Sequence, residues 1–133
     1  MEKEIVTSFL LNSGKILIMK RSRLVGMHKG KYAAVSGFLD RNATPLAQAL
    51  AEIREETGIG KENLELIKKG EKLIVDDKEF GLTWIIHPFI FSSDTIYVKM
   101  NWENDDYKWI DPKEMEKYNC IQGLRDILVS LIK

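Results

Sequence analysis

Three carboxylates gathered on one short stretch of the chain are the side chains best suited to chemistry. They are Glu52, Glu55 and Glu56. Like charges at helical spacing repel one another, so such a group is unfavourable unless a cation lies against it. Magnesium prefers oxygen ligands of this kind. The cluster therefore predicts a site for a divalent cation, with a solvated acidic helix face as the alternative.

The segment that carries the three carboxylates has the signals of a helix. Thr44 is a suitable N-cap, and Pro45 suits the first helical position because its missing N–H costs nothing there. Gly58 fits the left-handed residue that ends a helix. Glu52 and Glu56 flank an apolar stripe of helical periodicity, which consists of Leu46, Ala49, Leu50 and Ile53. The three carboxylates can thus converge on one ion while the stripe is buried.

The stretch GFLDRNATPLAQALAEIREETGI resembles the Nudix box, whose pattern is G-x5-E-x7-R-E-U-x-E-E-x-G-U, where U is aliphatic. The match runs from the opening glycine to the last aliphatic residue without an insertion. The matching positions are Gly37, Glu52, Ile53, Glu55, Glu56, Gly58 and Ile59. This register, together with the Thr-Pro helix start, makes the resemblance specific.

Two positions of the box depart from the pattern, because Ala43 replaces its first Glu and Ala51 replaces its Arg. In the family these two residues are read as supporting charges that orient the catalytic helix. Their joint loss leaves no unpaired buried charge, whereas the loss of one would. The metal ligands are kept, while catalytic efficiency is open to question. Asp40 and Arg54 are nearby charges that could substitute.

The resemblance implies an enzyme that hydrolyses a diphosphate linkage between a nucleoside and another group. Magnesium, for which manganese is a possible substitute, neutralises phosphate oxygens and lowers the pKa of a bound water. Positioning and electrostatic stabilisation then carry most of the catalysis. A small-molecule nucleotide is the expected partner.

The resemblance also implies roles for individual residues. The metal ligands would be Glu52, Glu55 and Glu56, and Glu52 or Glu55 would orient or deprotonate the attacking water. The backbone carbonyl of Ser36 is a candidate for a further ligand. Family members often recruit one more acidic residue from a loop outside the box, and Glu103 is the candidate here. Two competitors follow in the same loop, Asp105 and Asp106.

A basic loop, KRSRLVGMHKGKY, precedes the box and offers cations for phosphate. Arginine can hold phosphate oxygens in a bidentate fork. Arg21, Arg23 and Lys31 are therefore candidate substrate-binding residues, with ordinary surface charge as the alternative.

Aromatic residues and histidines are the remaining candidates. Tyr32 and Trp84 could stack a base, although such residues more often belong to the core. His28 lies in the basic loop, where an exposed histidine without a role is the expectation. His87 lies in an apolar segment and is expected to be a hydrogen-bonded core histidine.

The chain is expected to form one domain over residues 1–133, an α/β/α sandwich with a mixed β-sheet, and the resemblance implies the same layout. Apolar patterning predicts strands over 4–11, 15–20, 32–38, 64–69, 72–75, 82–91, 95–100 and 107–110. Pro88, inside the most apolar of these segments, indicates a bulge or an N–H position that faces an edge. Asn119 is expected to cap a final helix.

Composition excludes several classes of protein. Hydrophobic residues make up 44% and charged residues 30% of the sequence, which is typical of a globular domain. A formal net charge of zero gives no support for a nucleic-acid or membrane surface. The single cysteine, Cys120, and the lack of a signal-like or membrane-spanning stretch predict a cytoplasmic protein. A monomer or homodimer is expected.

The sequence thus predicts a magnesium-dependent pyrophosphohydrolase. The short chain favours a nucleoside triphosphate or a dinucleoside polyphosphate over ADP-ribose or a nucleotide sugar. A catalytically weak module that binds a nucleotide or a protein is the main alternative, and the two box alanines motivate it. An isoprenyl-diphosphate isomerase would need a catalytic cysteine, and Cys120 lies in another part of the chain. A structural α/β domain would not explain the retained carboxylates.

Overall fold

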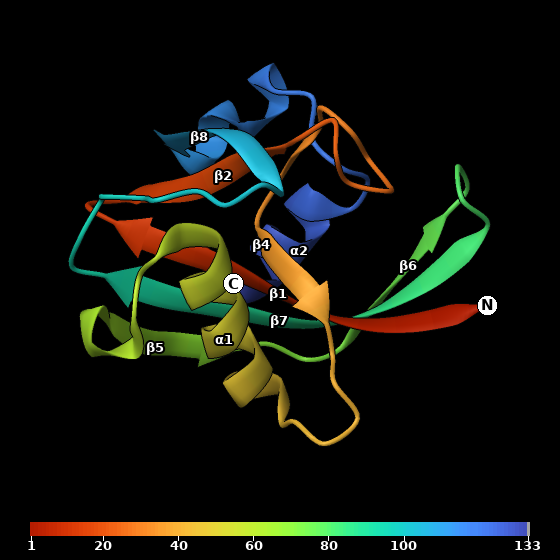
Figure 1. The fold of residues 1–133 in the computed structure, drawn as a ribbon, viewed down its shortest axis with the longest axis horizontal. Helices are drawn as coiled ribbons and strands as arrows, with labels where there is room; N and C mark the ends of the chain where they lie inside the picture. Colours follow the sequence, from red (N-terminus) through yellow and green to blue (C-terminus); the bar gives the residue numbers. More distant parts are fainter. Residues whose placement is uncertain (133) are drawn as a thin grey trace.

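A mixed β-sheet with helices on both faces forms the molecule (Figure 1), in a computed structural model that describes residues 1–132. The strands are β1 (Glu2–Asn12), β2 (Lys15–Arg21), β3 (Tyr32–Ala33), β4 (Val35–Phe38), β5 (Leu64–Lys69), β6 (Leu73–Asp77), β7 (Leu82–Ser93) and β8 (Asn104–Ile110). The helices are α1 (Pro45–Thr57) and α2 (Leu124–Ile132), with short 3-10 turns at Lys61–Asn63 and Pro112–Lys117.

The sheet divides beyond the hairpin that joins β1 to β2. The two strands pair only next to their turn, from Leu11↔Ile16 to Asn12↔Lys15. Further along, β1 pairs with β4 on one side and runs parallel to β7 on the other, while β2 pairs with β3 and β8. The β3–β4 segment therefore crosses the gap between the diverging strands and brings the residues before the box into it.

Apolar side chains on the two faces of the sheet make two cores, one for each helix. Beneath α1, Ala49 and Ile53 pack with residues that include Val6, Leu10, Leu17, Met19, Phe89 and Phe91. Beneath α2, Leu124, Ile127, Leu128 and Leu131 pack with residues that include Phe9, Ile16, Ile18, Ile86 and Ile90. The predicted α/β/α arrangement is confirmed.

The helix that carries the carboxylates begins and ends as the sequence predicts. The Thr44 hydroxyl oxygen accepts a hydrogen bond from the Ala47 N–H at 3.2 Å, and Pro45 is the first helical residue. Gly58 has φ 75° and donates its N–H to the Arg54 carbonyl at 2.9 Å. Because both caps are local, the position of α1 in the chain is set by the sequence next to it.

Pro88 lies in the central strand β7, opposite the interval between two edge strands. Pairing of β5 with β7 ends at Lys69↔Phe89, and pairing of β6 begins at Leu73↔Ile86. The Pro88 carbonyl accepts from the Gly70 N–H at 2.9 Å in this interval. The missing N–H of Pro88 therefore faces this interval, in line with its predicted edge-facing position, while the pairing with β1 continues at Thr7↔Pro88.

Three predicted elements are corrected. The predicted strand over 95–100 is wrong: this segment crosses beside the end of α1, where the Lys99 N–H donates to the Thr57 carbonyl at 2.8 Å. The final helix begins at Leu124, because residues 119–121 pair with Tyr32 instead. The predicted strand over 32–38 is two strands, since its halves pair with β2 and β1.

Neither α1 nor α2 is long and apolar enough to cross a membrane.

Candidate active site

The carboxylates of α1 lie in a partly buried acidic cluster. Glu55 is exposed, Glu52 is half-buried and Glu56 is buried. Burial raises the pKa of Glu52 to about 7, and the neighbouring charges of Glu55, Glu103 and Asp40 add to the effect. The predicted metal ligands of the box are therefore close enough to influence one another. A cation among them would favour their ionised forms.

Glu56 carries the clearest sign of a missing partner. Its side chain is 4% exposed, and its Oε1 accepts from the Asn104 amide at 3.2 Å. Its Oε2 is buried and has no hydrogen-bond donor. Burial raises the pKa of Glu56 well above its usual value, and the charges of Glu103 and Glu52 add to this, while Asn104 and Arg21 oppose it. An orphaned carboxylate oxygen among other carboxylates fits a hard divalent cation.

The pairing of β2 with β8 brings Arg21 and Glu103 to this cluster. Arg21 is opposite Asn104 in the register of the two strands, and the Ser22 N–H donates to the Glu103 carbonyl at 2.8 Å. Burial lowers the pKa of Arg21, while Glu56 and Glu103 oppose that shift. One guanidinium thus interacts with two carboxylates, and this excess of negative charge would suit Mg²⁺. Glu103 lies near Glu56 and Glu52, and its recruitment to the metal stays a prediction.

The box loop and α1 hold Glu52 between them. A Cβ atom on Gly37 would overlap the carboxyl group of Glu52. The Gln48 side-chain amide donates to Glu52 Oε1 at 3.1 Å, and its oxygen accepts from the Asp40 N–H at 3.1 Å. Sequence reasoning missed Gln48, although its position one helical turn before Glu52 is a signal for such a contact.

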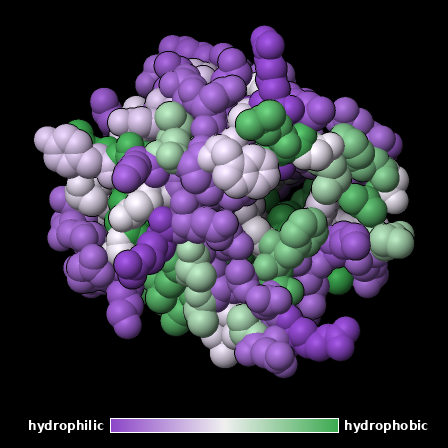
Figure 2. Space-filling view, in the orientation of Figure 1, coloured by the Kyte–Doolittle hydropathy of each residue, from purple (hydrophilic) through white to green (hydrophobic). Residues whose placement is uncertain are grey.

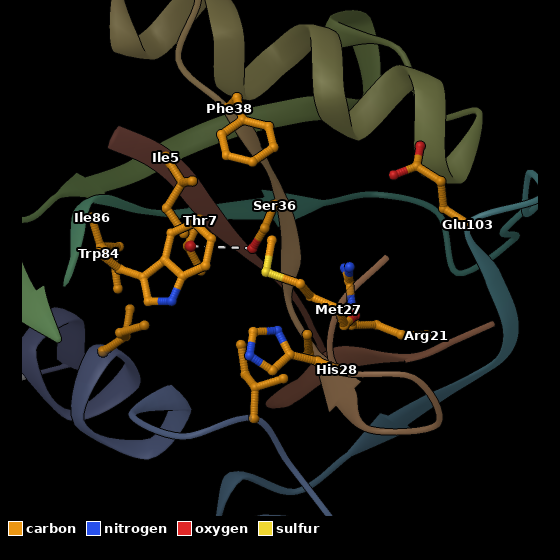
Figure 3. Close-up of a pocket in the computed structure, with 14 residues that line it drawn as sticks. Ile5, Thr7, Arg21, Met27, His28, Ser36, Phe38, Trp84, Ile86 and Glu103 are labelled. Atoms are coloured by element: carbon orange, nitrogen blue, oxygen red, sulfur yellow. Dashed lines mark hydrogen bonds between the residues drawn. The ribbon is translucent and has the colours of Figure 1, made fainter. Parts of the chain in front are cut away.

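A pocket extends from this charged end to an aromatic end. Figure 3 shows Glu103 and Arg21 on one side, with Trp84 and Phe38 towards the other. The Phe38 and Trp84 ring centroids are 6.2 Å apart, and Ile5, Ile86 and Met27 also line this apolar part. The space-filling view shows a hollow with apolar residues at its rim (Figure 2). Trp84, a candidate for base stacking, is therefore part of the pocket wall.

His28 also lines the pocket, contrary to the expectation of an exposed histidine without a role. Its Nε2 lies 2.8 Å from Asp77 Oδ2, and its side chain is only 14% exposed. Burial opposes ionisation of Asp77, but hydrogen bonds from Trp84, His28 and Phe80 together hold its pKa below the usual value. No local signal predicts this pair, because His28 and Asp77 are 49 residues apart in the chain.

The same pair belongs to a second group of potential metal ligands. Each of His28, Asp77 and Glu79 offers one potential ligand atom, and these three atoms lie within 4.8 Å of one another. Asp77 already accepts from Trp84 Nε1 at 3.0 Å and from two backbone N–H groups. Its oxygens are thus occupied by protein donors, so this group supports the pocket wall and is separate from the box carboxylates.

Other predicted residues lie in different places. Arg23 is exposed, and Lys31 Nζ is 3.5 Å from Glu79 Oε2. Tyr32 donates its hydroxyl to Asp106 at 2.8 Å, and burial and this bond raise its pKa to about 12. Among the described residues, the pocket lining includes Arg21 and Ser36 but none of these three. The predicted substrate-binding role of Arg23, Lys31 and Tyr32 stays a prediction.

Ser36 and His87 complete the set of predicted residues. Ser36 lines the pocket, and its hydroxyl lies 3.1 Å from the Thr7 hydroxyl across the β1–β4 pair. His87 Nε2 is 3.0 Å from Glu4 Oε1, and its side chain is 12% exposed. His87 is thus hydrogen-bonded as expected, but it is only half-buried beside the exposed Glu4 and does not belong to the core.

Comparison with known proteins supports one family. The NUDIX domain family matches residues 1–129. A MutT protein from Methanosarcina mazei Go1 shares 18% identity over 96% of this chain and 91% of its own, with a TM-score of 0.79. A C. elegans Ap4A hydrolase shares 17% identity over 97% and 93%, with a TM-score of 0.76. For a MutT NUDIX hydrolase from Burkholderia pseudomallei the identity is 16%, both coverages are 98% and the TM-score is 0.77. The curated proteins gave no match.

The chain therefore belongs to the NUDIX domain family, because the family match covers nearly all of it. Its class is that of the Nudix hydrolases, enzymes that act on phosphorus-containing acid anhydrides. At identities below one fifth, the similar structures establish the fold and leave the substrate open.

Proposed function

We propose that this protein is a magnesium-dependent pyrophosphohydrolase that cleaves the diphosphate linkage of a nucleoside triphosphate or a dinucleoside polyphosphate. The unpartnered, buried Oε2 of Glu56 carries the proposal. It lies in a carboxylate cluster that includes Glu103, and Glu103 and Arg21 line one end of a pocket whose other end is aromatic. A cation site for phosphates thus adjoins a cavity that offers an apolar site for a base.

Different residues of the chain have different roles in the proposed reaction. Glu52, Glu55 and Glu56 hold the metal, and Glu103 and the Ser36 carbonyl are candidates to complete its ligands. When bound, the ion neutralises phosphate charge and acidifies a water. Glu52 or Glu55 orients the attacking water or accepts its proton. Arg21, half-buried beside Glu56, binds the phosphate oxygens.

The aromatic end of the pocket takes the base. Phe38 is 55% exposed at the pocket and Trp84 is almost buried, so one ring can cover a base while the other stays fixed. Aromatic faces stack bases with little specificity. The Ap4A hydrolase among the similar structures supports a dinucleoside polyphosphate as one substrate class. ADP-ribose and nucleotide sugars remain the alternative substrates.

A second candidate function is a catalytically weak module that binds a nucleotide or a protein. Ala43 and Ala51 favour it, because both lack the charges that the family places there. In either case we propose a small nucleotide as the ligand, with no role for nucleic acid or membrane, and a monomer or homodimer in the cytoplasm. Manganese would replace magnesium at the same carboxylates.

The test is release of phosphate, pyrophosphate and nucleotides from a panel of substrates, with Mg²⁺ or with a chelator. The panel contains nucleoside triphosphates, diadenosine polyphosphates, ADP-ribose and nucleotide sugars. Magnesium-dependent cleavage of either of the first two classes supports the proposal, and cleavage of the others alone corrects the substrate. If a folded protein binds Mg²⁺ and a nucleotide but cleaves nothing, the binding module replaces the enzyme.

A further inference from the structure

We propose that Gln48 is a positioning residue that fixes the metal-facing carboxylate of Glu52 to the box loop. The proposal rests on the metal site of the proposed function and assigns a role to a residue outside the family pattern. The observation that carries it is the pair of hydrogen bonds from the Gln48 amide, one to Glu52 Oε1 and one from the Asp40 N–H, each at 3.1 Å.

The chemistry of the two partners determines which way the amide points. The Asp40 backbone N–H can only donate, so it requires the amide oxygen. An ionised Glu52 can only accept, so it requires the amide NH₂ group. Glutamine meets both requirements at once, and its half-buried side chain lies one helical turn before Glu52. A carboxylate at position 48 could not donate to Glu52, and an apolar side chain could make neither hydrogen bond.

Positions 43 and 51 cannot supply this support. Both are alanines, whose methyl groups form no hydrogen bond, and Ala51 is exposed. Among residues 1–132, the side-chain amide of Gln48 donates the hydrogen bond that the Glu52 carboxylate accepts. Gly37 closes the other side, where a side chain would overlap Glu52. The loop from Gly37 to Asp40 and the first turns of α1 thus hold Glu52 from two directions.

Outer residues that orient a metal ligand typically change metal affinity or activity by 10-fold to 100-fold. Loss of the Gln48 amide should therefore weaken metal binding and lower kcat. It should leave KM for the nucleotide nearly unchanged, because Gln48 is not among the residues that line the pocket. A residue that merely stabilised α1 would change the melting temperature and leave the metal affinity as it was.

The experiment uses the full chain with Gln48→Met, which keeps the length of the side chain and removes both hydrogen bonds. Ala47→Met is the matched control, since it adds the same side chain one residue earlier at an exposed position. The dissociation constant of Mn²⁺ is measured on metal-stripped protein by the electron paramagnetic resonance of free Mn²⁺. Melting temperature, kcat and KM follow on the same samples.

Gln48→Met should bind Mn²⁺ about tenfold more weakly than the wild type and the control. Equal Mn²⁺ affinity in the two methionine variants overturns the proposal, whatever the melting temperature does. If Gln48→Met does not fold, Gln48→Asn must show the loss, because its shorter amide cannot span both partners. If the wild type binds Mn²⁺ and cleaves the substrates, and Gln48→Met binds Mn²⁺ equally well, only the role of Gln48 is refuted. A wild type that binds no Mn²⁺ refutes the proposed function as well.

Discussion

Glu52 packs its carboxyl group directly against the backbone of Gly37, the opening glycine of the box. A Cβ atom on Gly37 would overlap the Cγ, Cδ and Oε1 atoms of Glu52. Gly37 is not among the glycines with positive φ, so its backbone conformation does not require glycine. The small residue is needed because the carboxyl group of Glu52 occupies the space of its side chain.

Gly37→Ala should therefore displace Glu52 and lower magnesium-dependent turnover by about 100-fold, since misplacing a catalytic group by an ångström has that order of effect. The measurement is kcat at saturating Mg²⁺, with the melting temperature of each variant. Gly26→Ala is the control, because a Cβ there would meet nothing within 4 Å. Equal losses in the two variants would mean that the glycine contact has no special role.

Glu55 is exposed, so its charge can be removed without disturbing the core. Glu55→Gln keeps the volume and removes one proposed ligand, and we expect turnover to fall by about 100-fold or more. Glu65→Gln, at an exposed position on β5, is the control. Circular dichroism should show both variants folded, and unchanged turnover in Glu55→Gln would remove Glu55 from the site.

Phe38 offers a test of the base site, because its ring lines the pocket while it is 55% exposed. Phe38→Ala should raise KM for a nucleoside substrate about tenfold, as loss of one stacked ring costs about 1 kcal/mol or more. The melting temperature should change little. Ile74→Ala, at an apolar position that is 72% exposed, controls for loss of a surface side chain. The base site is misplaced if KM is the same in both variants.

Restoring the two family charges tests whether positions 43 and 51 communicate. We expect Ala43→Glu with Ala51→Arg to be tolerated, and each single change to be worse than the pair. Turnover and melting temperature of the four proteins form a double-mutant cycle. Purely additive effects would show that the two positions are independent.

Local signals in the sequence were enough for the helix of the site. Thr44, Pro45 and Gly58 determine where α1 begins and ends through contacts within a few residues, and the structure has these caps. Most strands of the sheet also follow runs of apolar residues that can be read locally, although the segments 32–38 and 95–100 needed correction. The box then places Glu52, Glu55 and Glu56 together because all three are on one helix.

Contacts between distant segments could not be predicted in this way. The apolar pattern of residues 95–100 resembles a strand, yet Val98 and Met100 pack on the core beneath α1 and the Lys99 N–H donates to the Thr57 carbonyl at the end of that helix. Asn119 could have capped a helix, but its carbonyl accepts from the Tyr32 N–H instead. His28 and Asp77 are brought together only when the β6–β7 turn meets the basic loop. Each outcome depends on a partner that the local sequence does not specify.

Glu56 provides the most direct test of the account, because the same carboxylate should cost stability and supply function. Its raised pKa means that the folded protein keeps a proton that the unfolded chain releases. Stability is therefore lost as pH rises from the ordinary range of a glutamate towards the folded pKa, and Glu52, with a pKa of about 7, adds to this loss. Glu56→Gln removes the ionisable group at similar volume.

The measurement pairs two readouts on the wild type and Glu56→Gln. One is the melting temperature of the metal-free proteins between about pH 5 and pH 9, and the other is magnesium-dependent turnover of the best substrate. We predict that the variant melts higher than the wild type at alkaline pH and loses turnover by about 100-fold or more. Retained magnesium-dependent turnover in Glu56→Gln would contradict the assignment of this carboxylate to the metal site.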